Sequence, residues 1–191
     1  MPRECPAHVT LRVRRGFPSL RRRPFVTELR RSFREACERG YFRVVQFSVQ
    51  TDHVHLLVET AGKPALGRGM KSIAARVARA VNRVFGRAGA VLLGRYHVRA
   101  LRTPKAVRNA LAYVLLNARK HWRHRRGTAL PVILDEASSA EWFDGWIRRT
   151  QPLSSGEPPP VAAARTWLLR MGWRRHGLID PAKVPGEKKQ P

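Results

Sequence analysis

The feature that most constrains the fold is a pair of apolar segments separated by only two residues. Residues 42–50 (FRVVQFSVQ) and 53–60 (HVHLLVET) are rich in β-branched and aromatic side chains, a composition that favours strands. Thr51 and Asp52 lie between them, and residues of this kind favour a tight turn. The two segments therefore predict a β-hairpin.

The segments on either side of this hairpin complete an alternation of strands and helices. The periods of their apolar side chains predict a strand at residues 8–13, helices at about 24–39, 65–84 and 104–122, and a loop with a fourth strand within 91–101. Strand, helix, strand, strand, helix, strand is the split βαβ order of ferredoxin-like folds. We therefore expect an α+β fold with a ferredoxin-like core, in which helices cover one face of an antiparallel sheet. An additional helix and a C-terminal extension follow the core.

We expect the chain to divide near residue 124. Residues 1–124 form the expected core domain together with the additional helix, and residues 125–191 form the extension. The extension contains a Pro- and Ser-rich linker at 151–160. It also contains a basic segment with tryptophans at 164–177, which we expect to be a helix packed on the core.

The charge of the chain points to a polyanionic partner. Its 38 Lys and Arg against 13 Asp and Glu give a formal net charge of +25. No acidic residue occurs between Glu59 and Asp135, although this stretch holds seventeen Lys and Arg. A codon bias toward arginine would not also remove the carboxylates, so the stretch predicts a nucleic-acid surface. The residues expected to contact DNA are Arg76, Arg79, Arg83, Arg87, Arg95, Tyr96 and Arg99.

Nothing in the sequence indicates a membrane-bound or secreted protein. The segment MPRECPAHVT has no apolar signal region, and no stretch approaches the ~20 apolar residues of a membrane span. Cys5 and Cys37 do not form a disulfide framework. We expect a cytoplasmic protein whose two thiols stay reduced.

Two histidines interrupt the apolar pattern of the second hairpin strand. His53 and His55 are two residues apart, so they share one face of the strand, with Cα atoms roughly 6.5–7 Å apart. Two adjacent imidazoles can bind a divalent metal or can simply line a polar surface. Taken alone, the pair leaves both interpretations open, and strand histidines are more often structural.

A second polar pair lies on the helix expected at 104–122. Tyr113 and Asn117 are one turn apart, on the side away from the apolar stripe of that helix. Together with His53 and His55 they fit one chemistry, in which the imidazoles and the amide oxygen hold Mg²⁺ or Mn²⁺. Such a cation polarises a phosphodiester, and the phenol can then attack it to form a phosphotyrosine. A phenol has a pKa near 10 and needs activation, for which Lys120 is a candidate, as it is for holding a phosphate.

Five segments in this order resemble the single-tyrosine DNA transposases that carry an HUH motif, which is two histidines around a hydrophobic residue. The segments are HVTLRV with SLRRR, FSVQTDHVHLLVE, a basic helix ending in FGRAG, GRYHVRALRTP, and NALAYVLLNARKH. More narrowly, the chain resembles the insertion-sequence-200-like group called REP-associated tyrosine transposases, over about residues 7–122. It departs from that group where Ala118 replaces the proline that often follows the asparagine. Beyond about residue 124 we find no counterpart.

The resemblance implies a ferredoxin-like core that binds a divalent metal and cleaves and rejoins single-stranded DNA, often near a hairpin. It assigns His53, His55 and Asn117 as metal ligands and Tyr113 as the nucleophile that forms a 5′-phosphotyrosine. The expected partner is hairpin or palindromic single-stranded DNA. Whether the chain acts as a monomer or as a homodimer stays open.

Two alternatives use the same residues differently. A non-catalytic binder of structured single-stranded DNA or RNA would need the basic helix and the aromatic residues, but not the paired histidines and tyrosine. A metal-dependent phosphodiesterase that activates water would need the histidines but not the phenol of Tyr113. Tyr96 is a second candidate tyrosine, and its arginine neighbours favour DNA contact instead.

Overall fold

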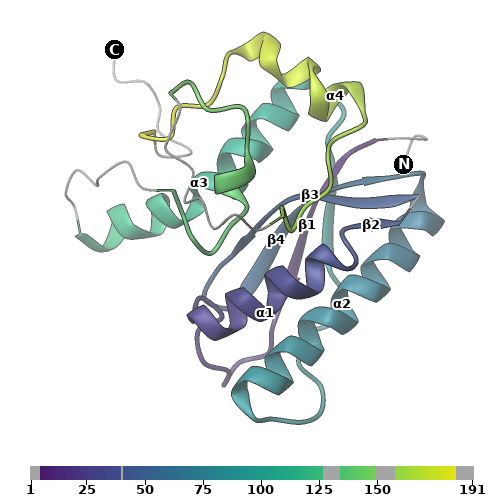
Figure 1. Ribbon diagram of the computed structural model, residues 1–191, viewed down its shortest axis with the longest axis vertical. Helices are drawn as coiled ribbons and strands as arrows, with labels where there is room; N and C mark the ends of the chain where they lie inside the picture. The colour runs from purple at the N-terminus through teal and green to yellow at the C-terminus, as the bar shows by residue number, and fades with distance from the viewer. Residues whose placement is uncertain (1–4, 40, 127–133, 149–157, 184–191) are drawn as a thin grey trace.

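The predicted hairpin forms the centre of a five-stranded antiparallel sheet (Figure 1). The computed structural model describes residues 5–39, 41–126, 134–148 and 158–183. Its strands are β1 (Ala7–Arg12), β2 (Glu38–Arg39), β3 (Phe42–Val49), β4 (His53–Thr60) and β5 (His97–Ala100). Its helices are α1 (Arg23–Arg34), α2 (Lys63–Phe85), α3 (Pro104–Arg126) and α4 (Trp167–Arg170), with short 3₁₀ turns η1 (Ala140–Trp142) and η2 (Gly172–His176).

The strand order confirms the predicted fold class. The sheet runs β2-β3-β4-β1-β5, and each strand is antiparallel to its neighbours. Without the two-residue β2, this is the split βαβ arrangement, in which β4 lies between β1 and β3. The expected turn at Thr51 and Asp52 is present, because the Gln50 amide donates to the His53 carbonyl at 2.8 Å.

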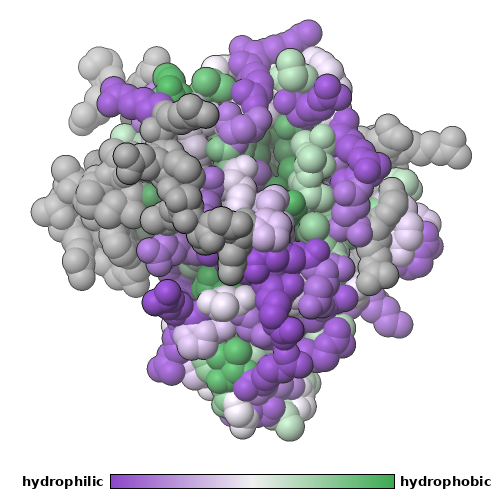
Figure 2. Space-filling view, in the orientation of Figure 1, coloured by the Kyte–Doolittle hydropathy of each residue, from purple (hydrophilic) through white to green (hydrophobic). Residues whose placement is uncertain are grey.

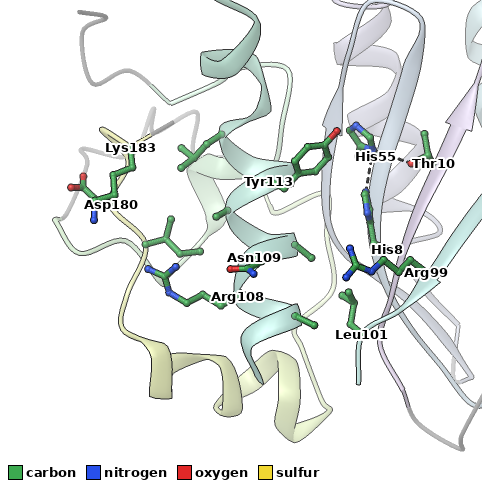
Figure 3. Close-up of a pocket in the computed structure, with 15 residues that line it drawn as sticks. His8, Thr10, His55, Arg99, Leu101, Arg108, Asn109, Tyr113, Asp180 and Lys183 are labelled. Carbon is green, nitrogen blue, oxygen red and sulfur yellow. Dashed lines mark hydrogen bonds between the residues drawn. The ribbon is translucent and has the colours of Figure 1, made fainter. Parts of the chain in front are cut away.

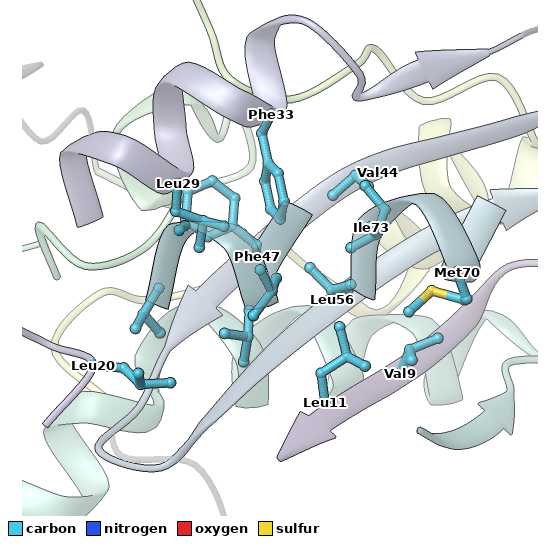
Figure 4. Close-up of a cluster of buried hydrophobic side chains, with 14 of the residues drawn as sticks. Val9, Leu11, Leu20, Leu29, Phe33, Val44, Phe47, Leu56, Met70 and Ile73 are labelled. Carbon is cyan, nitrogen blue, oxygen red and sulfur yellow. The ribbon is translucent and has the colours of Figure 1, made fainter. Parts of the chain in front are cut away.

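The sheet separates two hydrophobic cores, so both of its faces are covered (Figure 1). On β4, Val54, Leu56 and Val58 face α1 and α2, whereas Leu57 faces α3. Figure 4 shows the first core, where Phe33 of α1 and Ile73 of α2 reach the sheet. The additional helix α3 therefore lies on the face opposite α1 and α2. Side chains that alternate along β4 point by turns into the two cores.

The first helix is shorter than its apolar period predicts. It ends at Arg34 instead of Arg39, because the amides of Ala36 and Cys37 both donate to the Phe33 carbonyl and close the last turn. The Cys37 carbonyl then accepts a hydrogen bond from the Val44 amide at 2.7 Å. Pairing with β3 thus takes the segment that the sequence pattern assigned to the helix.

The described part of the C-terminal segment packs on α3 and on the edge of β3. Trp173 is almost fully buried in the second core, and the amide of Ser139 donates to the Phe47 carbonyl at 3.0 Å. The helix expected at 164–177 is present in two pieces, α4 and η2. Of the predicted linker, only residues 158–160 fall within the described ranges.

A buried carboxylate of β4 anchors this segment. Glu59 accepts hydrogen bonds from the backbone amides of Arg165 and Thr166 and from the Thr166 hydroxyl, at 2.7–3.1 Å. Thr166 in turn caps α4 through the Leu169 amide.

None of the helices that the structure describes has the length and apolar character of a membrane span.

Two glycines of α2 provide a matched test of how the helix packs on the sheet. A Cβ at Gly69 would lie 2.2–2.7 Å from ring atoms of Phe42, whereas a Cβ at Gly67 would meet nothing within 4 Å. We expect Gly69→Ala to lower the free energy of unfolding by about 1–3 kcal/mol through overpacking. Gly67→Ala should raise it by about 0.5–1 kcal/mol, because alanine favours the helix. Urea denaturation of both variants measures the difference, and equal stabilities would contradict this packing.

Candidate active site

The two histidines of β4 point toward α3 and approach each other closely. His55 is buried, and the His53 side chain is 13% exposed. Their Nε2 atoms are 3.0 Å apart, and the two rings are nearly perpendicular, with centroids 4.6 Å apart. Two nitrogen ligands at neighbouring positions of an octahedral cation, each about 2.1 Å from it, would be separated by about this distance. The pair therefore has the spacing of a two-nitrogen metal site.

The loop before β4 fixes the orientation of one of these rings. Nδ1 of His53 lies 2.6 Å from Oδ1 of Asp52, so this nitrogen donates and Nε2 keeps its lone pair. Burial favours the protonated acid, but the hydrogen bond and electrostatic interaction with His53 and the positive charge of Arg12 outweigh it and lower the pKa of Asp52. A carboxylate behind a histidine in this way is typical of metal-binding imidazoles.

Tyr113 reaches this pair from α3. Figure 3 shows its ring extending from the helix with the hydroxyl end directed toward His55. The Tyr113 ring centroid is 5.2 Å from that of His55 and 5.7 Å from that of His8, edge-on in both cases. The residue is half-buried and lines a pocket. The structure thus brings the predicted nucleophile to the predicted metal ligands.

Asn117 lies one turn further along α3. It was expected on the side away from the apolar stripe, but it is buried, with 1% of its surface exposed. The C-terminal segment covers the side of α3 that was expected to be polar, so apolar side chains pack on both sides of the helix. Nδ2 of Asn117 has no hydrogen-bond partner among the residues that the structure describes. Rotating the amide by 180° would exchange Oδ1 and Nδ2, so either atom can occupy this position, and the role of Asn117 as a ligand stays a prediction. The side chain of Lys120 lies outside the described residues.

The site also contains two residues of β1 that the sequence analysis did not identify. His55 Nδ1 is 3.1 Å from Nε2 of His8 and 3.1 Å from Oγ1 of Thr10, because Thr10 pairs directly with His55 in the sheet. Burial, then the charges of Arg99 and His53, lower the pKa of His8 from 6.5 to about 4. The alternation of HVTLRV already places His8 and Thr10 on one face, but only strand pairing shows which face.

A pocket of about 680 Å³ opens beside Tyr113. Arg99 of β5 lines it next to His8, and Arg108 and Asn109 of α3 line it further along the helix (Figure 3). Its far wall comes from the C-terminal segment, through Asp180 and Lys183. Arg108 fixes that wall by donating to the carbonyls of residues 177 and 178. Three of these side chains are cationic, so the pocket suits a polyanionic strand.

Comparison with known proteins identifies the family of the chain. Residues 3–98 match the family model described as "Transposase IS200 like". The chain belongs to the IS200-like transposase family. The matched residues contain the histidine pair and β1 but end before α3, so they do not include Tyr113 or Asn117.

One solved structure shares the fold of this IS200-like transposase. Its description is "Structure of the REP associates tyrosine transposase bound to a REP hairpin". The TM-score is 0.55 at 16% sequence identity, over 85% of this chain and 87% of that chain. This share exceeds what residues 1–124 could supply, so part of the C-terminal segment also has a structural counterpart, contrary to expectation. No curated relative matches the chain.

Three arginines of α2 and Arg87, just after its end, were expected to bind DNA but lie away from the site. Helix α2 covers the opposite face of the sheet from His55. Arg76 and Arg83 form ion pairs with Glu35 and Glu28 at 3.4 and 2.7 Å. Arg87 donates to the carbonyl of residue 16 and stacks on a phenylalanine ring, while Arg79 is exposed. Two of these arginines therefore hold α1 and α2 together.

The segment before β5 is divided between the two sides of the sheet. Tyr96 is half-buried against the core formed with α1 and α2. Arg95 is exposed and does not line the pocket, whereas Arg99, which is exposed on β5 itself, does line it. Figure 2 shows that hydrophilic side chains also dominate the surface over α1.

A metal ion on the histidine pair would need a further ligand of another kind. Within the described ranges, no group of three or more His, Cys, Asp or Glu side chains could hold a metal ion. Amide and substrate oxygens would suit Mg²⁺ or Mn²⁺, and Asn117 stays the predicted source of the amide.

The pKa of His8 offers a test of the pocket's charge. Arg99→Gln removes the positive charge beside His8, so we expect the pKa of His8 to rise from about 4 toward 6.5. It should stop short of 6.5, because burial is the larger cause. An NMR titration of the imidazole signals in metal-free protein measures the shift. Arg95→Gln, which removes an exposed arginine four residues earlier, is the control. A pKa of His8 that stays the same in Arg99→Gln would refute the placement of Arg99 beside His8.

Proposed function

We propose that this transposase cleaves and rejoins single-stranded DNA through a 5′-phosphotyrosine on Tyr113. One observation carries the proposal: the Tyr113 ring lies 5.2 Å from the ring of His55, whose Nε2 is 3.0 Å from that of His53. A tyrosine that only packed on a core would need no such neighbours. The membership in the IS200-like transposase family supports the same reaction.

His53, His55 and the Asn117 amide are the residues that would hold Mg²⁺ or Mn²⁺. When bound, the cation would neutralise charge that develops on the phosphate oxygens. The Tyr113 oxygen attacks the phosphorus, so that an O–P bond forms, the bond to the 3′ oxygen breaks, and the phenol loses its proton. The leaving oxygen takes up a proton and becomes a free 3′-hydroxyl. Reversal of these steps rejoins the strand, because the ester energy is kept in the phosphotyrosine.

The pocket beside Tyr113 would hold the strand on one side of the cleaved phosphate. Arg99 stands at the end near His8 and Lys183 at the end near the C-terminal segment. Arg95, exposed just before β5, would add a contact to the DNA backbone. Lys120 keeps its predicted role of activating the phenol or holding a phosphate. The solved transposase structure that shares this fold contains a bound REP hairpin, which supports hairpin-forming DNA as the substrate. Residues 1–124 would carry the reaction, with the extension bracing α3.

The covalent intermediate gives the direct test. We expect a labelled single-stranded hairpin, incubated with the protein and Mn²⁺, to become covalently attached. Tyr113→Phe should abolish the adduct, because the attacking oxygen is lost. His53→Ala should reduce it by at least about 100-fold, in line with the loss of a charge-stabilising group. Denaturing gel electrophoresis measures the adduct.

A matched variant separates this reaction from DNA binding. Tyr41→Phe removes the hydroxyl of an exposed tyrosine that stacks with Arg68, and it should leave adduct formation intact. If no hairpin forms an adduct while DNA binding stays tight and insensitive to Tyr113 and His53, the protein is a binder of structured single strands. If Tyr113→Phe still cleaves DNA, water is the nucleophile.

A further inference from the structure

His8 is the one imidazole of the site that neither the HUH pattern nor the tyrosine explains. It lies on β1, opposite Leu57 of β4 and therefore diagonal to His55 on the same face of the sheet. Its Nε2 is 3.1 Å from Nδ1 of His55, the ring nitrogen that faces away from His53. Thr10 approaches the same nitrogen at 3.1 Å. These two side chains therefore decide which nitrogen of His55 carries the proton.

One arrangement of the protons links the two histidines by a hydrogen bond. Asp52 accepts a hydrogen bond from Nδ1 of His53, which leaves Nε2 of His53 as an acceptor. In this arrangement the proton of His55 lies on its Nε2, and the 3.0 Å contact between the two Nε2 atoms is an N–H···N hydrogen bond. Nδ1 of His55 is consequently an acceptor and takes a hydrogen bond from His8 Nε2 or from the Thr10 hydroxyl.

Metal binding requires the opposite direction. A cation between His53 and His55 needs a lone pair on both Nε2 atoms, so the proton of His55 must lie on Nδ1. That proton needs an acceptor at the same 3.1 Å contacts. His8 can supply one by carrying its own proton on Nδ1 instead of Nε2. The change concerns only which nitrogen of a ring carries its proton, since solvent exchange moves protons between the nitrogens.

We propose that His8, assisted by Thr10, is a positioning residue that switches from donor to acceptor and thereby holds His55 in its metal-binding tautomer. A neutral imidazole and a hydroxyl are among the few side chains that can serve both directions. A lysine or arginine at position 8 could only donate and would oppose the metal-binding form. The inference rests on the proposed function, because it takes His53 and His55 to be ligands.

The first test measures Mn²⁺ affinity by calorimetry on the full chain. We expect His8→Phe to weaken binding by about 10–100-fold, the usual cost of losing such a partner. His8→Gln, whose amide has both a donor and an acceptor, should restore most of the loss, and Thr10→Val should cause a smaller one. His97→Phe, at an exposed imidazole of the neighbouring strand β5, is the control and should bind as the wild type does.

The second test needs no variant and reads the tautomer directly. Long-range ¹H–¹⁵N NMR of the wild type should show His55 protonated on Nε2 without metal and on Nδ1 with Mg²⁺. A His55 tautomer that is the same in both states would overturn the inference, even if His8→Phe failed to fold.

The outcomes also separate this inference from the proposal beneath it. If His53→Ala abolishes Mn²⁺ binding and His8→Phe binds as the wild type does, only the role of His8 is refuted. If His53→Ala binds Mn²⁺ as tightly as the wild type, the proposed metal site fails and the role of His8 fails with it. Weak Mn²⁺ binding by His8→Phe together with nearly wild-type binding by His8→Gln supports the role.

Discussion

The antiparallel pairing of β1 with β4 is the constraint on which the rest of the structure depends. Its register places Thr10 opposite His55 and Leu11 opposite Val54. One set of alternating side chains therefore builds the core under α1 and α2, and the other set builds the polar site. A shift of β1 by one residue would turn His8 and Thr10 into the apolar core under α1 and α2, and Val9 and Leu11 out of it. The cost of burying unpaired polar groups there makes this register strongly preferred.

Helix α3 completes the site only because something else covers its outer side. The C-terminal segment buries Trp173 against α3, and Glu59 ties that segment back to β4 through two backbone amides. The helix is thus held between the sheet and the extension, and the Tyr113 ring has a defined place. The extension therefore supports α3 and also forms the far wall of the pocket.

Local patterns predicted much of this correctly. The hairpin, the strand order and the start of α3 at Pro104, where the Thr103 hydroxyl accepts from the Ala106 amide, all follow from side-chain period and capping chemistry. The predicted end of α1 was wrong because residues 38–39 pair with residues 42–43 of β3, and an apolar helical period does not reveal that a segment pairs as a strand. The arginine row of α2 has the right period for a surface. Its carboxylate partners on α1 are 41 and 55 residues away in sequence, and nothing in the pattern identifies them.

The sequence by itself determined the fold class, the excess of positive charge, and the presence of two same-face imidazoles and a tyrosine, because each depends on composition or on spacing within one element. Only the tertiary structure decided which charges remain available and which groups meet. It brought His8 and Thr10 of β1 to His55, buried Asn117, and turned the α2 arginines away from the site. The physical reason is that contacts between distant segments depend on strand register and on the face of the sheet that each helix covers, and neither is encoded in a local period.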